Sequence, residues 1–388
     1  MKQVIVKKTR HSPISNSLWI SKADITSRIE NYKRGELVEI YDSTHNFIGI
    51  GYINPSSNIS IRLLSTTKKE ISVDFLSDRI KRAYRLRKTL YQNSEVFRVV
   101  FSESDLLPGL IVDKFDNLVV FQITTAGMEK LRSKIIQAIE NTLYPEIIIE
   151  KSDSITRMKE GLDSRIQPVK GHLTGEKIIA INNIKFVINP LASQKTGFFL
   201  DQRDNYNLLE KISAGKTVLD CFCFNGAFGL HALKHGAKHV KFVDSSQSAI
   251  NATKKNLELN KIEENRYQLV KQDAFNFLNS SLSQKFDIII LDPPAFIKDR
   301  RKIENGIKGY KEINSKALKL LAPGGFLLTC SCSQLLSTKN FLRIIQYSSE
   351  KANREVKILK ISHQSADHPF RPDIPDSIYL KCALLYAR

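Results

Sequence analysis

The stretch that decides the fold reads Val218-Leu219-Asp220-Cys221-Phe222-Cys223-Phe224-Asn225-Gly226-Ala227-Phe228-Gly229. It is an apolar run that ends in an acid, followed by a short glycine-containing turn and the start of a helical pattern. This order is typical of the first strand, turn and helix of a nucleotide-binding unit. The turn lacks the complete Gly-x-Gly-x-x-Gly that lets a backbone approach a pyrophosphate, which disfavours an oxidoreductase that uses NAD or FAD.

Strand-like and helix-like segments alternate regularly around this turn. The predicted strands are 217–220, 239–244, 267–273, 286–292 and 325–332, and two further strands, 358–363 and 377–386, close the sheet. The predicted helices between them are 227–235, 247–260, 274–281 and 308–321. Regular alternation of this kind predicts an α/β fold with a parallel, doubly wound sheet.

The first half of the chain has a different pattern. Residues 1–73 alternate in short strands separated by turn signals, which predicts a small β-rich module. A basic helix is predicted at 74–93, and a mixed α/β segment follows it. In that segment we expect strands at 96–101, 118–123 and 146–150 and a helix at 127–143. We therefore predict three domains, 1–73, 74–185 and 186–388.

The composition is that of a globular protein, with 42% hydrophobic and 26% charged residues. No apolar run approaches the roughly 18 residues of a membrane span. The N-terminus lacks the features of a signal peptide, so we expect a cytoplasmic protein with reduced cysteines. Cys221/Cys223 and Cys330/Cys332 form two Cys-x-Cys pairs. Structural zinc sites use a wider spacing, so we expect no metal.

The net charge is strongly positive, +19 from 59 basic and 40 acidic residues. Such an excess favours a polyanionic partner, and no amphipathic anchor for a membrane accompanies it. The basic residues concentrate in two stretches, 79–88 and 298–311. A charged stretch is usually a solvated helix face, but the second one directly follows a candidate catalytic motif. The candidate RNA-binding residues are Arg82, Arg85, Arg300, Arg301 and Lys302.

Four predicted strands end in an aspartate, at Asp220, Asp244, Asp273 and Asp292. Because the carboxyl ends of parallel strands face one crevice, these acids should gather at a single site. Any one of them could equally cap the next helix, but all four together with a loose turn favour a cofactor site. S-adenosylmethionine carries an adenosine and an amino acid without phosphates, so it suits this turn.

The predicted cofactor contacts follow from these positions. Asp244, with Ser245 beside it, can bind two ribose hydroxyls, and Asp273, with Ala274, can meet the adenine amino group. The residues predicted from this pattern are Asp220, Phe222, Asn225, Gly226, Ala227, Asp244, Ser245, Asp273, Ala274 and Asp292.

The segment Asp292-Pro293-Pro294-Ala295-Phe296 is suited to holding a nucleic-acid base. Prolines hold the backbone stiff, so that its carbonyls and the Asp292 carboxylate can address the amino edge of the base. Phe296 offers a stacking face, as extruded bases commonly require. We therefore select Pro293, Pro294 and Phe296 as candidate base contacts. The alternative is an ordinary turn that ends the strand.

Cys332 ends the next predicted strand. Alternation along 326–332 predicts that Cys330 is buried and that Cys332 lies at the mouth of the site. A thiolate that attacks C6 of cytosine would make C5 nucleophilic enough to take a methyl group, while Asp292 would stabilise N3 of the adduct. A lone cysteine at a strand end is more often a small packed residue, so both interpretations stay open.

These motifs resemble those of the RlmI-type family of ribosomal-RNA large-subunit cytosine-C5 methyltransferases. The likeness covers nearly the whole chain and is carried by 195–205, 218–228, 292–296, 331–333, 364–369 and 379–381. The resemblance implies an N-terminal PUA RNA-binding module, a central α/β domain and a Rossmann-like seven-stranded class I methyltransferase sheet. It also implies S-adenosylmethionine as cofactor, with Phe199 and Gln202 in the motif that folds over it. Cys332 would be the nucleophile, and 23S ribosomal RNA the substrate.

Two alternative functions stay open. Related enzymes share the sheet and the Phe-Leu-Asp-Gln-Arg motif found at 199–203, but they methylate a guanine nitrogen, which needs no thiol. A non-catalytic RNA-binding protein of ribosome assembly would explain the charge, although it has no use for Cys332. Dimers are common among soluble proteins, so a homodimer is a further expectation.

Overall fold

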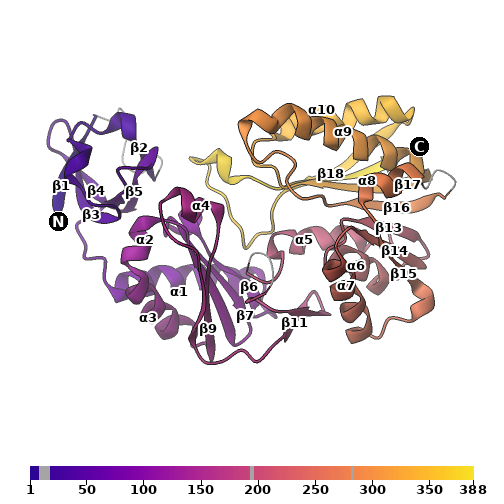
Figure 1. The fold of residues 1–388 in the computed structure, drawn as a ribbon, viewed down its shortest axis with the longest axis horizontal. Coiled ribbons are helices and arrows are strands. Elements are labelled where there is room, and N and C mark those ends of the chain that lie inside the picture. The colour runs from indigo at the N-terminus through magenta and orange to yellow at the C-terminus, as the bar shows by residue number, and fades with distance from the viewer. Residues whose placement is uncertain (8–17, 193–195, 281–283) are drawn as a thin grey trace. The chain divides into compact units, whose positions relative to one another are not determined.

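The computed structural model describes residues 1–7, 18–192, 196–280 and 284–388 (Figure 1). The chain divides into two compact units, each built from separate stretches of sequence. The first unit comprises Met1–Ile179, Ile188–Leu200 and Ala366–Pro375, and the second comprises Ala180–Val187, Asp201–Ser365 and Asp376–Arg388. The first unit therefore takes in most of the predicted first and second domains together, and the division into three domains stays a prediction.

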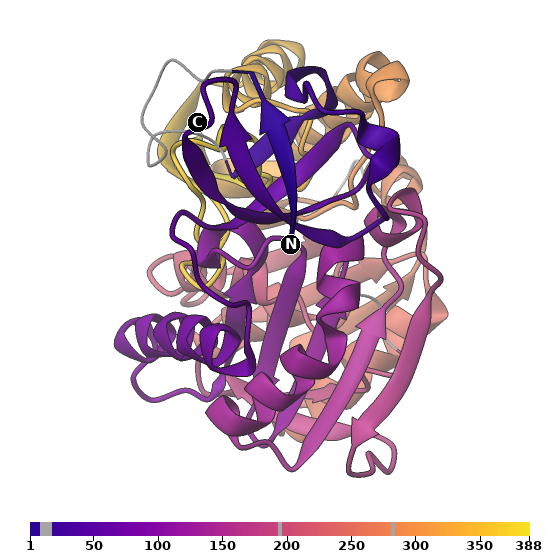
Figure 2. The ribbon, with the colours of Figure 1, turned by 90° about the vertical axis from the view of Figure 1, so that its left-hand side faces the viewer.

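A twisted five-stranded sheet begins the first unit (Figure 2). Its strands are β1 (Lys2–Val6), β2 (Trp19–Ser21), β3 (Glu36–Asp42), β4 (Phe47–Ile53) and β5 (Ile59–Ser65), in the order β1-β3-β4-β5-β2. Val4, Val38, Ile40 and Ile61 are fully buried in its core. Branched residues that alternate along a strand suit a half-buried pleated surface. The predicted β-rich module is confirmed.

A second five-stranded sheet and its helices complete most of this unit. The strands are β6 (Val96–Phe101), β7 (Leu110–Phe115), β8 (Leu118–Ile123), β9 (Ile147–Ser152) and β10 (Arg165–Lys170), in the order β10-β9-β8-β7-β6. The helices are α1 (Val73–Leu90), α2 (Ala126–Lys130), α3 (Arg132–Leu143) and α4 (Ile155–Lys159). Leu76 and Ile80 of α1 and Ile135 of α3 belong to the same buried core as the strands.

Sequence patterns missed several features of this region, among them β7, β10 and α4. Strand β7 was not predicted, because Asp113 and Lys114 interrupt its apolar run. Asp113 is nevertheless fully buried, since both of its carboxylate oxygens accept hydrogen bonds from Arg98, at 2.7 and 2.8 Å. The single helix predicted at 127–143 is wrong in one respect, because the chain breaks it at Leu131 into α2 and α3.

The second unit contains a seven-stranded sheet in the order β15-β14-β13-β16-β17-β19-β18. Its strands are β13 (Thr217–Cys221), β14 (His239–Asp244), β15 (Tyr267–Lys271), β16 (Phe286–Leu291), β17 (Leu321–Ser331), β18 (Val356–Ser362) and β19 (Lys381–Ala387). The first five strands are parallel, as predicted. The prediction of an all-parallel sheet is wrong at β19, which runs antiparallel to both of its neighbours.

Helices cover both faces of this sheet. They are α6 (Ala227–Lys234), α7 (Gln247–Leu259), α8 (Ala274–Ser280), α9 (Ile303–Leu320) and α10 (Thr338–Ala352). Helices α8, α9 and α10 share one buried cluster with Leu219, Val243 and Ile289, whereas α6 packs on Val240 and Phe242, whose side chains point to the other face. The predicted helix end at Ser281 lies outside the described residues.

Helix α10 was not predicted, although its sequence carries the signal. Its buried residues Phe341, Ile344, Ile345 and Ser348 follow the spacing of one helical face, and Ser337 caps its first turn by accepting a hydrogen bond from Asn340 N at 3.2 Å. Helix α9 begins at Ile303, five residues before the predicted start at 308, and so takes in part of the second basic stretch.

Short elements connect these sheets. They are β11 (Lys177–Ile181), β12 (Ile184–Ile188), a one-turn 3₁₀ helix at Leu200–Gln202 and α5 (Arg203–Tyr206). Within the described ranges, none of the helices is long and apolar enough to cross a membrane.

Candidate active site

Two of the predicted strand-end acids, Asp220 and Asp292, lie where the strand order of the seven-stranded sheet reverses. The chain runs from β13 outward through β14 to β15, and then from β16 outward in the other direction to β17. Ligands of doubly wound sheets bind at such a switch point, beyond the carboxyl ends of the strands. Asp220 lies near the end of β13, and Asp292 directly follows β16, which is the neighbouring strand.

The turn after β13 has an unusual backbone. Phe222, Phe224 and Gly226 have φ angles of 61°, 53° and 76°, which lie in the left-handed region. This region is costly for side chains as large as phenylalanine, and such residues cluster at ligand sites. Asp244 holds the turn in place, because its Oδ2 accepts a hydrogen bond from Phe224 N at 3.0 Å.

Two glycines permit close packing around this turn. A Cβ added to Gly226 would lie 2.7 Å from Cγ2 of Thr253, and one added to Gly229 would lie 2.1 Å from Cε1 of Phe242. Gly229 therefore allows α6 to pack closely on the sheet, which is the role of the third glycine in a nucleotide-binding fingerprint. The turn keeps this packing glycine although it lacks the complete glycine pattern.

Asp220 is a buried acid. Its Oδ2 accepts a hydrogen bond from Gly229 N at 2.9 Å, inside the first turn of α6. Burial, with a smaller contribution from the charges of Asp292 and Asp244, raises the pKa of Asp220 from 3.8 to about 8, although the hydrogen bond from Gly229 opposes the rise. Acidic residues with a strongly shifted pKa are typical of functional sites.

This pKa predicts a specific dependence of stability on pH. Between about pH 4 and pH 8 the folded protein keeps the Asp220 proton that the unfolded chain loses, so the free energy of unfolding should fall as pH rises through this range. Asp220→Asn should remove that part of the slope, because an amide does not titrate. Urea unfolding of both proteins without cofactor, between about pH 5 and pH 8, measures the difference. A difference between the two proteins that stays constant with pH would contradict the assignment.

The other two strand-end acids also support the ends of helices. Asp273 Oδ1 accepts a hydrogen bond from Asn276 N at 3.0 Å in the first turn of α8, so this exposed residue acts as a helix cap. Asp244 Oδ1 accepts from Ser246 N at 2.9 Å, at the start of α7. Ser245 is exposed, whereas Ala274 is buried. Adenosine contacts by these residues stay a prediction.

The remaining predicted cofactor residues are distributed over both units. Gln202 donates from Nε2 to Asp292 Oδ1 at 2.9 Å, and its own Oε1 accepts from Asn205 at 2.7 Å. Asn225 and Ala227 are buried within the turn. Phe199 belongs to the first unit, and Lys195 of the same motif lies outside the described residues.

The ring of Phe296 is part of an aromatic cluster. Its centroid lies 4.6 Å from that of Tyr310, 5.7 Å from that of Phe275 and 6.4 Å from that of Phe222. These contacts give Phe296 a packing role beside the predicted stacking role. Of the two prolines, Pro293 is buried and Pro294 is exposed.

Cys332 follows the last residue of β17 and is partly accessible, whereas the other four cysteines are buried. Its Sγ lies 3.7 Å from the carbonyl oxygen of Pro293 and donates to it. The thiol thus stands beside the segment that begins with Asp292, as the two neighbouring strand ends predicted. Cys330 is fully buried, also as predicted, with its Sγ 2.8 Å from that of Cys382 on β19.

Only part of the first basic stretch faces solvent. Arg82 and Arg85 are exposed on α1, but Arg87 is fully buried and donates two hydrogen bonds to Asp105, at 2.6 and 2.7 Å. Arg300, Arg301 and Lys302 form an exposed 3₁₀ turn directly before α9. The five selected residues are therefore accessible, and contact with RNA stays a prediction.

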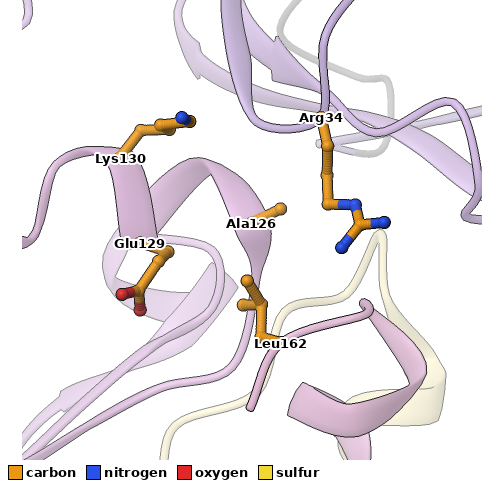
Figure 3. Close-up of a pocket in the computed structure, with 5 residues that line it drawn as sticks. All are labelled: Arg34, Ala126, Glu129, Lys130 and Leu162. Atoms are coloured by element: carbon orange, nitrogen blue, oxygen red, sulfur yellow. The ribbon is translucent and has the colours of Figure 1, made fainter.

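A pocket of about 560 Å³ in the first unit is lined by none of the residues selected above (Figure 3). It is lined by Arg34, Ala126, Glu129, Lys130 and Leu162. Its carboxylate, Glu129, is held by Arg157 and Arg165 at 2.8 Å each. These ion pairs make the half-buried Glu129 carboxylate part of the fold of this unit.

The strand order, the acids at the switch point and the open turn define a class of protein, the Rossmann-like methyltransferases that use S-adenosylmethionine. Family comparison agrees, since the model for S-adenosylmethionine-dependent methyltransferases matches residues 155–387 and that for PUA-like domains matches residues 4–66. The chain belongs to the S-adenosylmethionine-dependent methyltransferase family and carries an N-terminal PUA-like domain.

Curated relatives match over almost the full length. Ribosomal RNA large subunit methyltransferase I of Aeromonas hydrophila is 38% identical, over 99% of this chain and 98% of the relative. The protein of the same name from Photobacterium profundum is also 38% identical, over 95% of each chain. A solved structure of a proposed methyltransferase from Streptococcus mutans covers 100% of both chains with a TM-score of 0.84 at 21% identity, which supports the fold. A proposed methyltransferase in complex with SAH gives a TM-score of 0.85, with the same identity and coverage.

Proposed function

We propose that this protein methylates C5 of a cytosine in 23S ribosomal RNA through a covalent adduct with Cys332. One observation carries the proposal: the accessible cysteine stands at the end of β17, against the Pro293 carbonyl and beside Asp292. The names of the curated relatives support ribosomal RNA of the large subunit as the substrate. The exposed basic turn at 300–302 supports a phosphate backbone next to the site.

The residues around the switch point fit S-adenosylmethionine. The turn at 222–227 has left-handed backbone and a glycine where a Cβ has no room, and buried Asp220 and half-buried Asp244 supply carboxyl groups for an amino acid and a ribose. Asp273 and Ala274 would hold the adenine, and Gln202 would complete the part of the site that the second unit forms. When bound, S-adenosylmethionine supplies the methyl group.

In the proposed reaction, the Cys332 thiolate adds to C6 of cytosine, and the new Sγ–C6 bond makes C5 nucleophilic. A proton on Asp292, or shared with it, stabilises the charge that develops at N3. After C5 is methylated, it loses its proton, the Sγ–C6 bond breaks and the thiolate is restored. Gln202 orients the Asp292 carboxylate by its 2.9 Å hydrogen bond.

Incubation with labelled S-adenosylmethionine and unmodified 23S ribosomal RNA, followed by nucleoside analysis, tests this function. Label in 5-methylcytidine is the expected result. Label in a methylated guanosine would refute C5 chemistry and leave Cys332 a packing residue. An absence of label on the RNA would favour the non-catalytic assembly protein or another RNA substrate.

RNA binding should depend on the exposed turn before α9. Arg300→Glu together with Arg301→Glu should weaken binding to ribosomal RNA. It should also reduce the slope of log K against log salt concentration by about one for each lost phosphate contact. Fluorescence anisotropy with an rRNA fragment at several salt concentrations measures both effects. A matched control, Lys357→Glu with Lys360→Glu on exposed β18, changes the net charge equally. Equal slopes for the two double variants would contradict this placement of the RNA.

A further inference from the structure

Lys381 is a buried lysine beside the candidate nucleophile. It is the first residue of β19, its exposed fraction is 1%, and its Nζ donates to the carbonyl oxygens of Ser333 and Tyr379 at 2.7 and 2.9 Å. Among the described residues, no carboxylate lies within ion-pair distance of this ammonium. Burying an ammonium without a carboxylate partner costs free energy of folding, and this cost points to a functional role for Lys381.

The strand register places this ammonium next to Cys332. Lys381 pairs with Ser331 across β17 and β19, while its side chain reaches the carbonyl of Ser333. The Lys381 side chain therefore runs past Cys332, the residue between Ser331 and Ser333. An ammonium has three N–H donors, and the two carbonyls accept two of them. Burial lowers the pKa of Lys381 to about 8, and a negative charge on Cys332 opposes that shift.

Three other ionisable groups near Cys332, namely Tyr310, Cys330 and Asp292, carry no positive charge. Burial raises the pKa of Tyr310, on α9, to about 12, so its hydroxyl is neutral near pH 7; it shares a 2.9 Å hydrogen bond with Ser333 Oγ. Cys330 on the same strand is buried, and burial raises the pKa of its thiol. Asp292 begins the segment that Cys332 contacts, and a carboxyl group is either neutral or negative.

We propose that Lys381 is a positioning residue for Cys332, whose ammonium stabilises the thiolate before it attacks and again when it leaves the adduct. The inference rests on the proposed function, in which Cys332 is the nucleophile. The thiol proton passes to water, and no bond forms to Lys381. The hydrogen bond to the Ser333 carbonyl also fixes the backbone that carries the thiol.

Alkylation by iodoacetamide as a function of pH tests this role, because Cys332 is the accessible cysteine and the reaction needs neither cofactor nor RNA. Mass spectrometry assigns the modified residue. Lys381→Met should move the midpoint of the pH profile up by about one unit and slow alkylation near neutral pH about tenfold, because the thiolate fraction falls accordingly. Lys381→Arg keeps the charge and should retain most of the wild-type rate. Lys285→Met removes another lysine that binds a backbone carbonyl and should have no effect.

A wild-type midpoint in the Lys381→Met protein would overturn the proposal. So would an arginine variant that is folded but as slow as the methionine variant, because the ammonium would then matter only for packing. If Lys381→Met does not fold, the wild-type profile decides, since a midpoint at or above that of a free cysteine, about 8.5, excludes a stabilised thiolate. A negative result in the alkylation experiment would refute the role of Lys381 but leave the covalent mechanism untouched. An active Cys332→Ala protein would refute the covalent mechanism but not the effect of Lys381 on the thiol.

Discussion

Cys332→Ala should abolish methyl transfer, lowering turnover by roughly a thousandfold or more, while the affinity for S-adenosylmethionine stays nearly unchanged. The reason is that C5 of cytosine becomes nucleophilic only after a thiolate has added to C6. The thiol contacts the Pro293 carbonyl, whereas Asp220 and Asp244, two of the acids selected for the cofactor, lie on β13 and β14. Single-turnover methyl transfer and calorimetric titration with S-adenosylmethionine measure the two quantities separately.

Cys330→Ala is the matched control for this substitution. It removes a thiol two residues earlier on the same strand, but one that is buried against Cys382. The folded fraction of this variant should retain most of its turnover. A Cys332→Ala protein that turns over normally would refute the covalent adduct and favour methylation of a nitrogen, which needs no nucleophile from the protein.

Arg87→Ala should destabilise the first unit by about 3–5 kcal/mol, the typical cost of removing one partner of a buried ion pair. Arg87 is fully buried, and its guanidinium binds both oxygens of Asp105 together with the carbonyls of Arg98 and Asp367. The substitution leaves the Asp105 carboxylate, which is 6% exposed, without this partner. Urea unfolding followed by tryptophan fluorescence reports this unit, because Trp19 is the single tryptophan of the chain.

Arg85→Ala provides the comparison for that experiment. Arg85 lies on the same helix but faces solvent, so its removal should change the free energy of unfolding by less than about 0.5 kcal/mol. Similar losses for the two variants would mean that the Arg87–Asp105 pair contributes little beyond helix propensity.

Much of the fold could be predicted because apolar runs and their boundaries are local properties. The five parallel strands of the second unit were located to within a few residues, apart from the earlier start of β17. Strand β7 was missed because a charged residue can be buried when a distant partner neutralises it, as Arg98 does for Asp113. Arg87 was grouped with exposed basic residues for the same reason, since nothing near it in sequence reveals Asp105.

A site residue could be predicted where its position at the end of a strand determines its location at the edge of the sheet. The ends of β13, β14 and β16 and the accessible cysteine after β17 follow from the topology. Contacts made across the fold could not be predicted in this way. The hydrogen bond from Gln202 to Asp292 joins residues 90 positions apart, and Lys381 reaches Ser333 only because β19 runs antiparallel. The left-handed backbone at Phe222 and Phe224 was also unexpected, because glycine is the usual residue there.

The segment Ala366–Pro375 has a consequence for how the chain is made. It is synthesised after residues 201–365 of the second unit, yet it belongs to the first unit, where Asp367 Oδ2 accepts a hydrogen bond from Arg98 N at 2.9 Å and the Asp367 carbonyl accepts one from Arg87. An N-terminal unit generally completes its fold while the remainder is still being synthesised. Here residues 201–365 of the second unit must be synthesised before the first unit has all of its parts, so the first unit cannot complete its fold ahead of most of the second.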